Sequence, residues 1–303
     1  MRVTPYAGWP NCITLTNGRI EVVATTDVGP RIIRCGFVGE RNLFKEFAGQ
    51  LGSAGGEKWK VYGGHRLWHA PEDRIRTYEP DNDPIAFEWD EAHLTLTQPI
   101  ESGTGIRKSM TISVDPDRDM VTAVHRLENH GPSEVELAPW ALSVMAPGGR
   151  ALIPQERFSS HGGALLPARA LVLWPYTRMN DPRLTWGERV IQVRQDSASK
   201  APLKIGVGNR RGWAAHALDG YLFVVHAPMV EGAVYTDMGS SFEVFTNADM
   251  LEVETLGPLA RLSPGGGAAE HTERWHVLKR SLPEEEPELA EELDGIVAEL
   301  GIE

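Results

Sequence analysis

Residues 121–142 read VTAVHRLENHGPSEVELAPWAL, and this stretch decides the fold class. Apolar and β-branched residues recur along Met120–Leu127 and again along Val135–Leu142, as they do in strands. Between the two runs lies Asn129-His130-Gly131-Pro132, a group of residues that favours turns. The stretch therefore predicts a strand, a turn and a second strand of an antiparallel β protein.

The same pattern extends in both directions, from residue 13 to about residue 279. Short strand-like runs alternate with turn residues such as Asn17-Gly18. No segment before Pro283 keeps a helical period, and no glycine-rich phosphate-binding motif follows a strand. We therefore predict an all-β protein that uses no nucleotide or other cofactor. The further predicted strands are Arg19–Thr25, Arg31–Phe37, His93–Gln98, Ser109–Val114, Val190–Arg194, Leu222–His226, Phe242–Thr246, Leu251–Thr255 and Thr272–Leu278.

The end of the chain differs from the rest, because its apolar residues recur at helical spacing after Pro287 and glutamates lie between them. We predict one large sandwich domain over residues 1–282 and an acidic amphipathic helix over residues 283–303. The apolar side of this helix is expected to pack on the sandwich or on a partner subunit, and the second arrangement would give a homodimer. The apolar residues are Leu289, Leu293, Ile296, Val297 and Leu300.

Charge and cysteine content exclude several classes of partner. The formal net charge is −12, and Lys and Arg do not gather into a run, so neither nucleic acid nor a membrane surface is an expected partner. No stretch approaches the roughly 18 apolar residues of a membrane helix, and the first residues do not resemble a secretion signal. The two cysteines, Cys12 and Cys35, suit a reducing compartment. We predict a cytoplasmic protein.

Three stretches together resemble one family. They are NGRIEVVATTDVGPRIIRCGFVGERNLF (17–44), the strand–turn–strand unit of residues 121–142, and FEVFTNADMLEVETLGPLARLSPGG (242–266). Their order and turn residues are similar to those of the galactose mutarotase-like superfamily, which includes aldose 1-epimerases and sugar-phosphate epimerases. The resemblance implies a large antiparallel β-supersandwich with a sugar-binding groove on one sheet face. It also implies a histidine acid and a glutamate base.

The resemblance assigns the base to Glu254, which precedes a threonine and a proline at a family-like distance, with Glu252 as the second choice. Side chains two residues apart on a strand share one face of the sheet, so both carboxylates would face the groove. Such a pair would raise the pKa of at least one member, as a general base near neutral pH requires. Glu243, on the preceding strand, is either a cross-strand neighbour or faces outward.

The residue that should act as the catalytic acid is where the sequence departs from the family pattern. The position of the family's histidine falls in APWAL, residues 138–142, so a substitute is needed, and His65, His69 and His226 are the candidates. Trp140, within this segment, is expected in the core or at the floor of the groove, with stacking on a sugar ring as the functional alternative. Lys204 is expected to pair with a carboxylate or to be solvated.

The stretch VYGGHRLWHAPE, residues 61–72, supplies the candidate substrate contacts. After two glycines, Arg66 could donate a forked pair of hydrogen bonds and Trp68 could stack on a sugar. The alternative places Trp68 in the core and pairs Arg66 with Glu72 or Asp73.

The two histidines of this stretch, His65 and His69, have the spacing of a metal pair only on a helix. The flanking Gly-Gly and Pro argue against a helix, so no metal site is predicted there.

Three functions remain open on the sequence. The first is an aldose 1-epimerase-like isomerase that acts on a small-molecule carbohydrate by proton transfer, with Glu254 as base and His65 or His69 as acid. The second is a carbohydrate-binding protein that has kept the groove and lost catalysis. A relative of polysaccharide lyases or glycosidases is a third reading, which would show chain cleavage.

Overall fold

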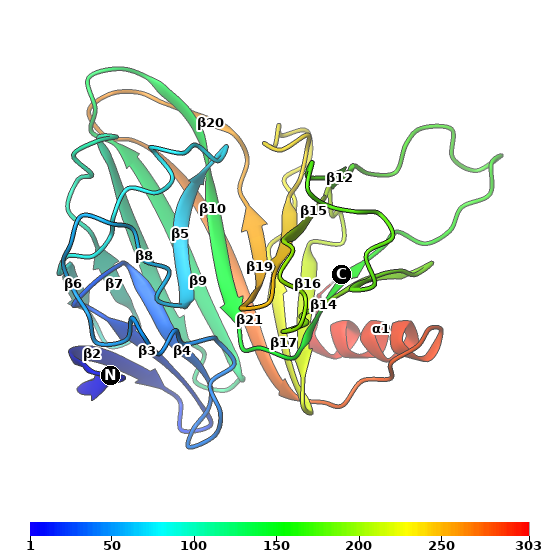
Figure 1. Cartoon of the computed structure of the whole chain (residues 1–303), viewed down its shortest axis with the longest axis horizontal. Coiled ribbons are helices and arrows are strands. Elements are labelled where there is room, and N and C mark those ends of the chain that lie inside the picture. Colours follow the sequence, from blue (N-terminus) through cyan, green and yellow to red (C-terminus); the bar gives the residue numbers. More distant parts are fainter. Residues whose placement is uncertain (303) are drawn as a thin grey trace.

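The computed structural model describes residues 1–302, which form two large antiparallel sheets packed face to face and one helix (Figure 1). This confirms the predicted all-β supersandwich with a short C-terminal helix. Among these residues no helix is long and apolar enough to cross a membrane.

The first sheet has 11 strands and carries the stretch of residues 61–72 near its centre. Its order is β1 (Arg2–Tyr6), β2 (Trp9–Thr16), β3 (Ile20–Thr25), β4 (Arg31–Phe37), β5 (Gly64–Ala70), β10 (Val135–Met145), β19 (Leu251–Leu256), β18 (Phe242–Thr246), β15 (Leu203–Val207) and β12 (Leu171–Leu173), with β20 (Ala260–Leu262) paired to the start of β10.

The second sheet has 10 strands and packs against the first. Its order is β13 (Leu184–Trp186), β14 (Val190–Arg194), β11 (Arg150–Pro154), β16 (Trp213–Leu218), β17 (Tyr221–His226), β21 (Gly267–Lys279), β9 (Met120–Asn129), β8 (Ile106–Val114), β7 (Leu94–Thr97) and β6 (Ala86–Trp89).

The turn at residues 130–134 carries the chain from one sheet to the other, because β9 lies in the second sheet and β10 in the first. Asn129 holds this crossing in place. Its amide nitrogen donates to the carbonyls of Ser133 and Leu262, and its side-chain oxygen accepts from the backbone of Gly131. The sequence pattern predicts the two strands, but it does not reveal that they belong to different sheets.

The main core lies between the sheets. Met145 and Val253 reach it from the first sheet, and Ala123, Phe223 and Trp275 reach it from the second; each is at most 2% exposed. Because side chains alternate along a strand, each of these residues fixes which of its neighbours point away from the core. The first sheet therefore has an inner face toward the core and an outer face toward solvent and loops.

The helix α1 (Glu288–Leu300) covers the outer face of the second sheet (Figure 1). Leu293 and Ile296 pack in one cluster with Trp213, Leu222 and Val224 of β16 and β17. The apolar side predicted for this helix is thus buried on the chain's own sandwich. A homodimer stays a prediction, and this side of the helix is already occupied.

The stretch of residues 61–72 is a central strand rather than the loop that its glycines suggest. The strand β5 pairs with β4 on one side and β10 on the other. Gly63 has φ +101°, and a Cβ there would lie 1.9 Å from the carbonyl oxygen of Lys45. The glycine pair therefore allows the backbone to pass close to residues 32 and 45 before β5 begins.

Candidate functional site

A row of polar side chains crosses the outer face of the first sheet. Leu142 of β10 pairs with Arg66 on one side and with Glu254 on the other, and Glu254 in turn pairs with Glu243 of β18. Directly paired residues share a face, so Arg66, Glu254 and Glu243 lie on one surface, opposite to the core. Two residues further along β19, Glu252 joins them.

Lys204 of β15 joins two of these carboxyls. Its Nζ lies 2.7 Å from Oε2 of Glu243 and 3.0 Å from Oε2 of Glu254. The three residues are 0–3% exposed, so their charges are shielded from water. Trp140 completes the arrangement, because its Nε1 donates a 2.8 Å hydrogen bond to the same Oε2 of Glu254.

One ammonium cannot compensate two buried carboxylates, and the titration of the group reflects this imbalance. Burial raises the pKa of Glu243 well above its usual value and also raises the pKa of Glu254, with Lys204 opposing both shifts. Burial by itself would lower the pKa of Lys204, but the two carboxyls outweigh it and raise that pKa. Both carboxyls therefore hold a proton more readily than an exposed glutamate does, and the stronger upward shift of the pKa is that of Glu243.

Arg66 forms the second charged centre on this face. Its Nη2 donates to Oε1 of Glu252 at 2.8 Å, and not to Glu72 or Asp73. The guanidinium carbon lies 4.5 Å from the centroid of the Trp68 ring and 5.5 Å from that of Trp59. Arg66 is therefore held between aromatic faces and an acid.

Aromatic residues enclose both charged centres. Trp68 and Trp140 meet edge to face, with their ring centroids 5.3 Å apart, and form the floor. Nζ of Lys204 lies 4.4 Å from the centroid of Trp140 and 4.8 Å from that of Trp174. Trp59, Tyr78 and Trp174 reach over from loops and are only half-buried. We call the residues of this face, including the charged ones, the aromatic–acid cluster: Trp59, Arg66, Trp68, Tyr78, Trp140, Trp174, Lys204, Glu243, Glu252 and Glu254.

Several buried polar atoms of this cluster have no hydrogen-bond partner among the described residues. They are Nε1 of Trp59, Nε and Nη1 of Arg66, Oε1 of Glu254 and both carboxyl oxygens of Glu243, of which Oε2 makes only the ion-pair contact with Lys204. Leaving such an atom unpaired costs about 1–3 kcal/mol, and more for a charged group. The donors and acceptors are thus available to a polar ligand that enters between the aromatic rings.

His65 does not face this cluster, which corrects the expectation that it could act with Glu254. On β5 it alternates with Arg66, so its ring lies on the inner face, between the sheets. There its Nε2 lies 2.7 Å from Nε2 of His125, and its Nδ1 lies 2.9 Å from Oγ of Ser143. The sheet itself separates His65 from Glu254.

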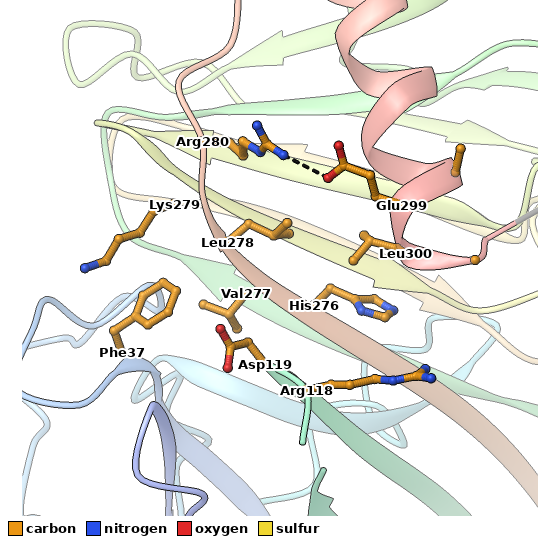
Figure 2. A pocket seen from close by; sticks show the side chains of 12 residues that line it. Phe37, Arg118, Asp119, His276, Val277, Leu278, Lys279, Arg280, Glu299 and Leu300 are labelled. Carbon is orange, nitrogen blue, oxygen red and sulfur yellow. Dashed lines mark hydrogen bonds and ion pairs between the residues drawn. The ribbon is translucent and has the colours of Figure 1, made fainter. Parts of the chain in front are cut away.

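The other two histidines are also placed apart from Glu254, and the same correction applies. His69 lies on the inner face with His65, where its Nε2 is 3.8 Å from the Glu101 carboxylate that Lys108 also contacts. His226 lies on β17 in the second sheet, diagonal to His276 across the pairing with β21. His276 lines a hollow of about 750 Å³ beside the end of α1 (Figure 2).

The sequence prediction thus named five residues that the structure brings together on the outer face of the first sheet, and it did not assign two further residues of that face to the site. Arg66, Trp68, Trp140, Glu252 and Glu254 come together, although their roles stay predictions. Glu243 and Lys204 were not assigned to the site. The turn at residues 247–250 could have revealed Glu243, because a short hairpin fixes the register that sets Glu243 opposite Glu254. Lys204 gave no such signal, since β15 joins β18 from a distant part of the sequence.

Comparison with known proteins supports the fold alone. No protein-family model matches the chain, and no curated protein matches it. A galactose mutarotase-like protein from Lactobacillus casei superposes with a TM-score of 0.58 at 10% identity, over 88% of this chain and 100% of that one. A protein from Escherichia coli K12, provisionally named an aldose 1-epimerase, gives a TM-score of 0.55 at 12% identity over 89% of this chain and 99% of that one.

A third structure is larger. It is a TPR-domain containing protein from Parabacteroides distasonis, with a TM-score of 0.61 at 14% identity. The match covers 90% of this chain and 48% of that protein, so the chain spans about half of its length. These likenesses, together with the two sheets described above, show that the chain has the galactose mutarotase-like fold.

Proposed function

We propose that the aromatic–acid cluster binds a sugar or sugar derivative and that the chain is an aldose 1-epimerase-like isomerase. The observation that carries the proposal is the buried Lys204 between Glu243 and Glu254, each of which keeps an unpartnered carboxyl oxygen. A base and an acid are thereby present side by side. The tryptophan rings supply apolar faces for a pyranose, and Arg66 supplies free donors.

In this reaction Glu254 accepts the proton of the anomeric hydroxyl. Protonated Glu243 gives its proton to the ring oxygen, and the bond between that oxygen and the anomeric carbon breaks to form the open-chain aldehyde. Rotation about the adjacent carbon–carbon bond presents the other face of the carbonyl. The ring then closes as both protons return, so the two carboxyls end as they began and no cofactor is consumed.

Lys204 makes the two carboxyls unequal. Its Nζ donates a hydrogen bond to Oε2 of Glu254 and makes a 2.7 Å ion-pair contact with Oε2 of Glu243, and Trp140 also donates to Glu254, so the charged form of Glu254 is the better supported of the two. Glu243 therefore takes the part that the sequence assigned to His65 or His69. A sugar reaches these groups only if the covering rings of Trp59, Tyr78 or Trp174 move, because the acids beneath them are at most 5% exposed.

The decisive experiment compares Glu254→Gln and Glu243→Gln with the wild type. Exchange between the anomers of common aldoses is measured by NMR, and sugar binding is measured by calorimetry. We expect each variant to lose at least 100-fold in exchange rate while binding changes less than about tenfold, because the amide keeps the shape and loses the proton transfer. Glu88→Gln, an exposed acid on β6, is the matched control.

The second candidate, a binding protein without catalysis, rests on one observation. Both Lys204 and Trp140 donate to the same oxygen of Glu254, and none of the candidate acids His65, His69 and His226 lies on this face. Sugar binding without anomer exchange in the wild type would favour it. If neither binding nor exchange occurs with neutral, acidic or phosphorylated aldoses, both proposals are wrong.

The proposed setting is the cytoplasm. Cys12 and Cys35 are both free and buried, which suits a reducing compartment.

A further inference from the structure

Three side chains of metal-binding type meet between the two sheets, on the opposite side of β5 from the aromatic–acid cluster. They are His65 of β5, His125 of β9 and Glu273 of β21, and each is at most 1% exposed. Nε2 of His65 lies 2.7 Å from Nε2 of His125 and 3.6 Å from Oε2 of Glu273. All their ligand atoms lie within 4.8 Å of one another.

The two imidazoles are oriented as metal-binding histidines are. Nδ1 of His125 lies 3.0 Å from the carbonyl oxygen of His271, so it must carry the proton and donate it, which leaves Nε2 with a free lone pair. Nδ1 of His65 can donate in the same way to Oγ of Ser143, at 2.9 Å. A hydrogen bond from the second ring nitrogen to a fixed acceptor is the usual outer shell of a metal-bound histidine.

The carboxylate has no cationic partner of the ordinary kind. Among residues 1–302, no Lys or Arg nitrogen lies within 4.0 Å of Glu273, and its one charge partner is His65. Its Oε2 accepts a 2.8 Å hydrogen bond from Nε1 of Trp275, and its Oε1 accepts a hydrogen bond from the Thr255 hydroxyl. A buried carboxylate is costly unless it is paired or binds a metal ion.

With Nδ1 of each ring facing a fixed oxygen acceptor, both imidazoles can present an Nε2 lone pair to the same point between the sheets. A lone pair on a neutral imidazole is the group that a metal ion binds. Thus two nitrogen lone pairs and the carboxyl group of Glu273 converge at one point, where no Lys or Arg among residues 1–302 balances the charge of the carboxylate.

We propose that His65, His125 and Glu273 bind a divalent transition-metal ion, and that Zn²⁺ is the ion that fits best. Zn²⁺ prefers imidazole and carboxylate ligands at about 2.0–2.2 Å in a tetrahedral arrangement, which sets neighbouring ligand atoms about 3.3 Å apart. The observed 2.7 and 3.6 Å lie on either side of that spacing, and no two ligand atoms are more than 4.8 Å apart, so side-chain adjustment could bring all three onto one ion.

The ion would have a structural role. One ligand comes from the first sheet and two from the second, so it would tie the halves of the sandwich together at the core. Because the three residues are buried, the ion would enter while the chain folds. The proposal is independent of any activity at the aromatic–acid cluster.

The test is to refold the full chain with and without metal. The protein is unfolded in denaturant with a chelator, refolded with Zn²⁺ or with chelator, and desalted. Its metal content is then measured by elemental mass spectrometry and its Tm by calorimetry. We expect about one Zn²⁺ per chain and a Tm several degrees higher after refolding with zinc. Less than a tenth of an equivalent, or an equal Tm, would show that the two histidines share a proton instead.

Variants locate the site. His65→Gln and His125→Gln should each lower the zinc content at least tenfold. His226→Gln is the matched control, because it removes a histidine that lies near His276 and could collect zinc from solution. Loss of zinc from His226→Gln with full zinc in His125→Gln would overturn the assignment.

The glutamine variants could fail to refold, so a second measurement uses the native chain. Refolding with Co²⁺ should produce the visible absorption of a tetrahedral Co²⁺ ion bound to nitrogen and oxygen. A refolded protein without that absorption would also overturn the proposal.

Discussion

At the residue scale, Lys204 is the side chain on which the aromatic–acid cluster depends. It is 3% exposed, and it is the cation that the structure places within 4.0 Å of Glu243 and Glu254. Arg66 and Glu252 balance each other in charge, but the two other carboxyls share one ammonium. Removing that ammonium would leave two acids buried without compensation, whereas removing one acid relieves the excess.

We therefore predict that Lys204→Met lowers the free energy of unfolding by about 3–5 kcal/mol at pH 7, the usual cost of breaking a buried ion pair on one side. Urea unfolding followed by tryptophan fluorescence measures the change. The double variant Lys204→Met/Glu254→Gln should recover part of the loss, because it also removes the carboxylate that Lys204 compensates. An equal loss in the single and double variants would mean that Glu254 carries no unfavourable charge.

Trp140 gives a second prediction at this scale. Its ring forms part of the floor of the aromatic–acid cluster, and its Nε1 donates a hydrogen bond to Oε2 of Glu254. Trp140→Phe keeps most of the ring and removes the donor, so the pKa of Glu254 should rise further. Activity depends on ionised Glu254, so the pH at which anomer exchange reaches half its maximum should move upward. An unchanged pH profile of the exchange rate would contradict the assignment of Glu254 as base.

At the scale of the elements, α1 depends on the sheet beneath it. An isolated helix of 13 residues is marginal in water, so packing against β16 and β17 supplies most of its stability. Gly301 ends the helix with φ +69°, a conformation that glycine adopts without strain.

Leu293→Ala should lower the free energy of unfolding by about 2–5 kcal/mol, because Leu293 is 1% exposed and its truncation leaves a cavity against the sheet. Glu291→Ala, on the exposed side of α1, is the matched control and should change it by less than about 0.5 kcal/mol. Thermal unfolding followed by circular dichroism compares the two. Similar small effects would mean that α1 contributes little to the cooperative unit.

At the scale of the whole molecule, burial of histidines makes stability depend on pH. Burial lowers the pKa of His216, which is 2% exposed in the second sheet, to about 3. The unfolded chain has the ordinary pKa of about 6.5, so it binds the proton first. The contribution of His216 is therefore fully present above pH 6.5 and is lost as the pH falls toward 3.

We predict that the free energy of unfolding declines steadily below pH 6.5, and that His216→Gln reduces the slope because one titrating group is gone. Urea unfolding at several pH values between 7 and 4 measures both slopes. Parallel curves for the variant and the wild type would show that His216 is not buried as a neutral ring.

The sequence by itself determined many of the strands, the C-terminal helix and part of the site's face, but not β5, whose glycines suggest a loop. Alternation of apolar residues marked the strands that were predicted, whereas Glu254 and Glu252 were assigned through the family resemblance and Arg66 and Trp68 from the side-chain types that follow the glycine pair. Neighbours along one strand obey a strict alternation, which is why Glu252 and Glu254 were correctly placed together. The same alternation puts His65 and Arg66 on opposite faces, once β5 is known to be a strand.

The tertiary structure decided which strands became neighbours. Pairing of β5 with β10, and of β15 with β18, joins residues at least 35 positions apart, and no local pattern encodes such a choice. For that reason only the folded chain brings Lys204 to Glu254 and sets His65 against His125. The direction in which a side chain points follows from the local geometry of its strand. The residue that it meets there follows from the packing of the whole sandwich.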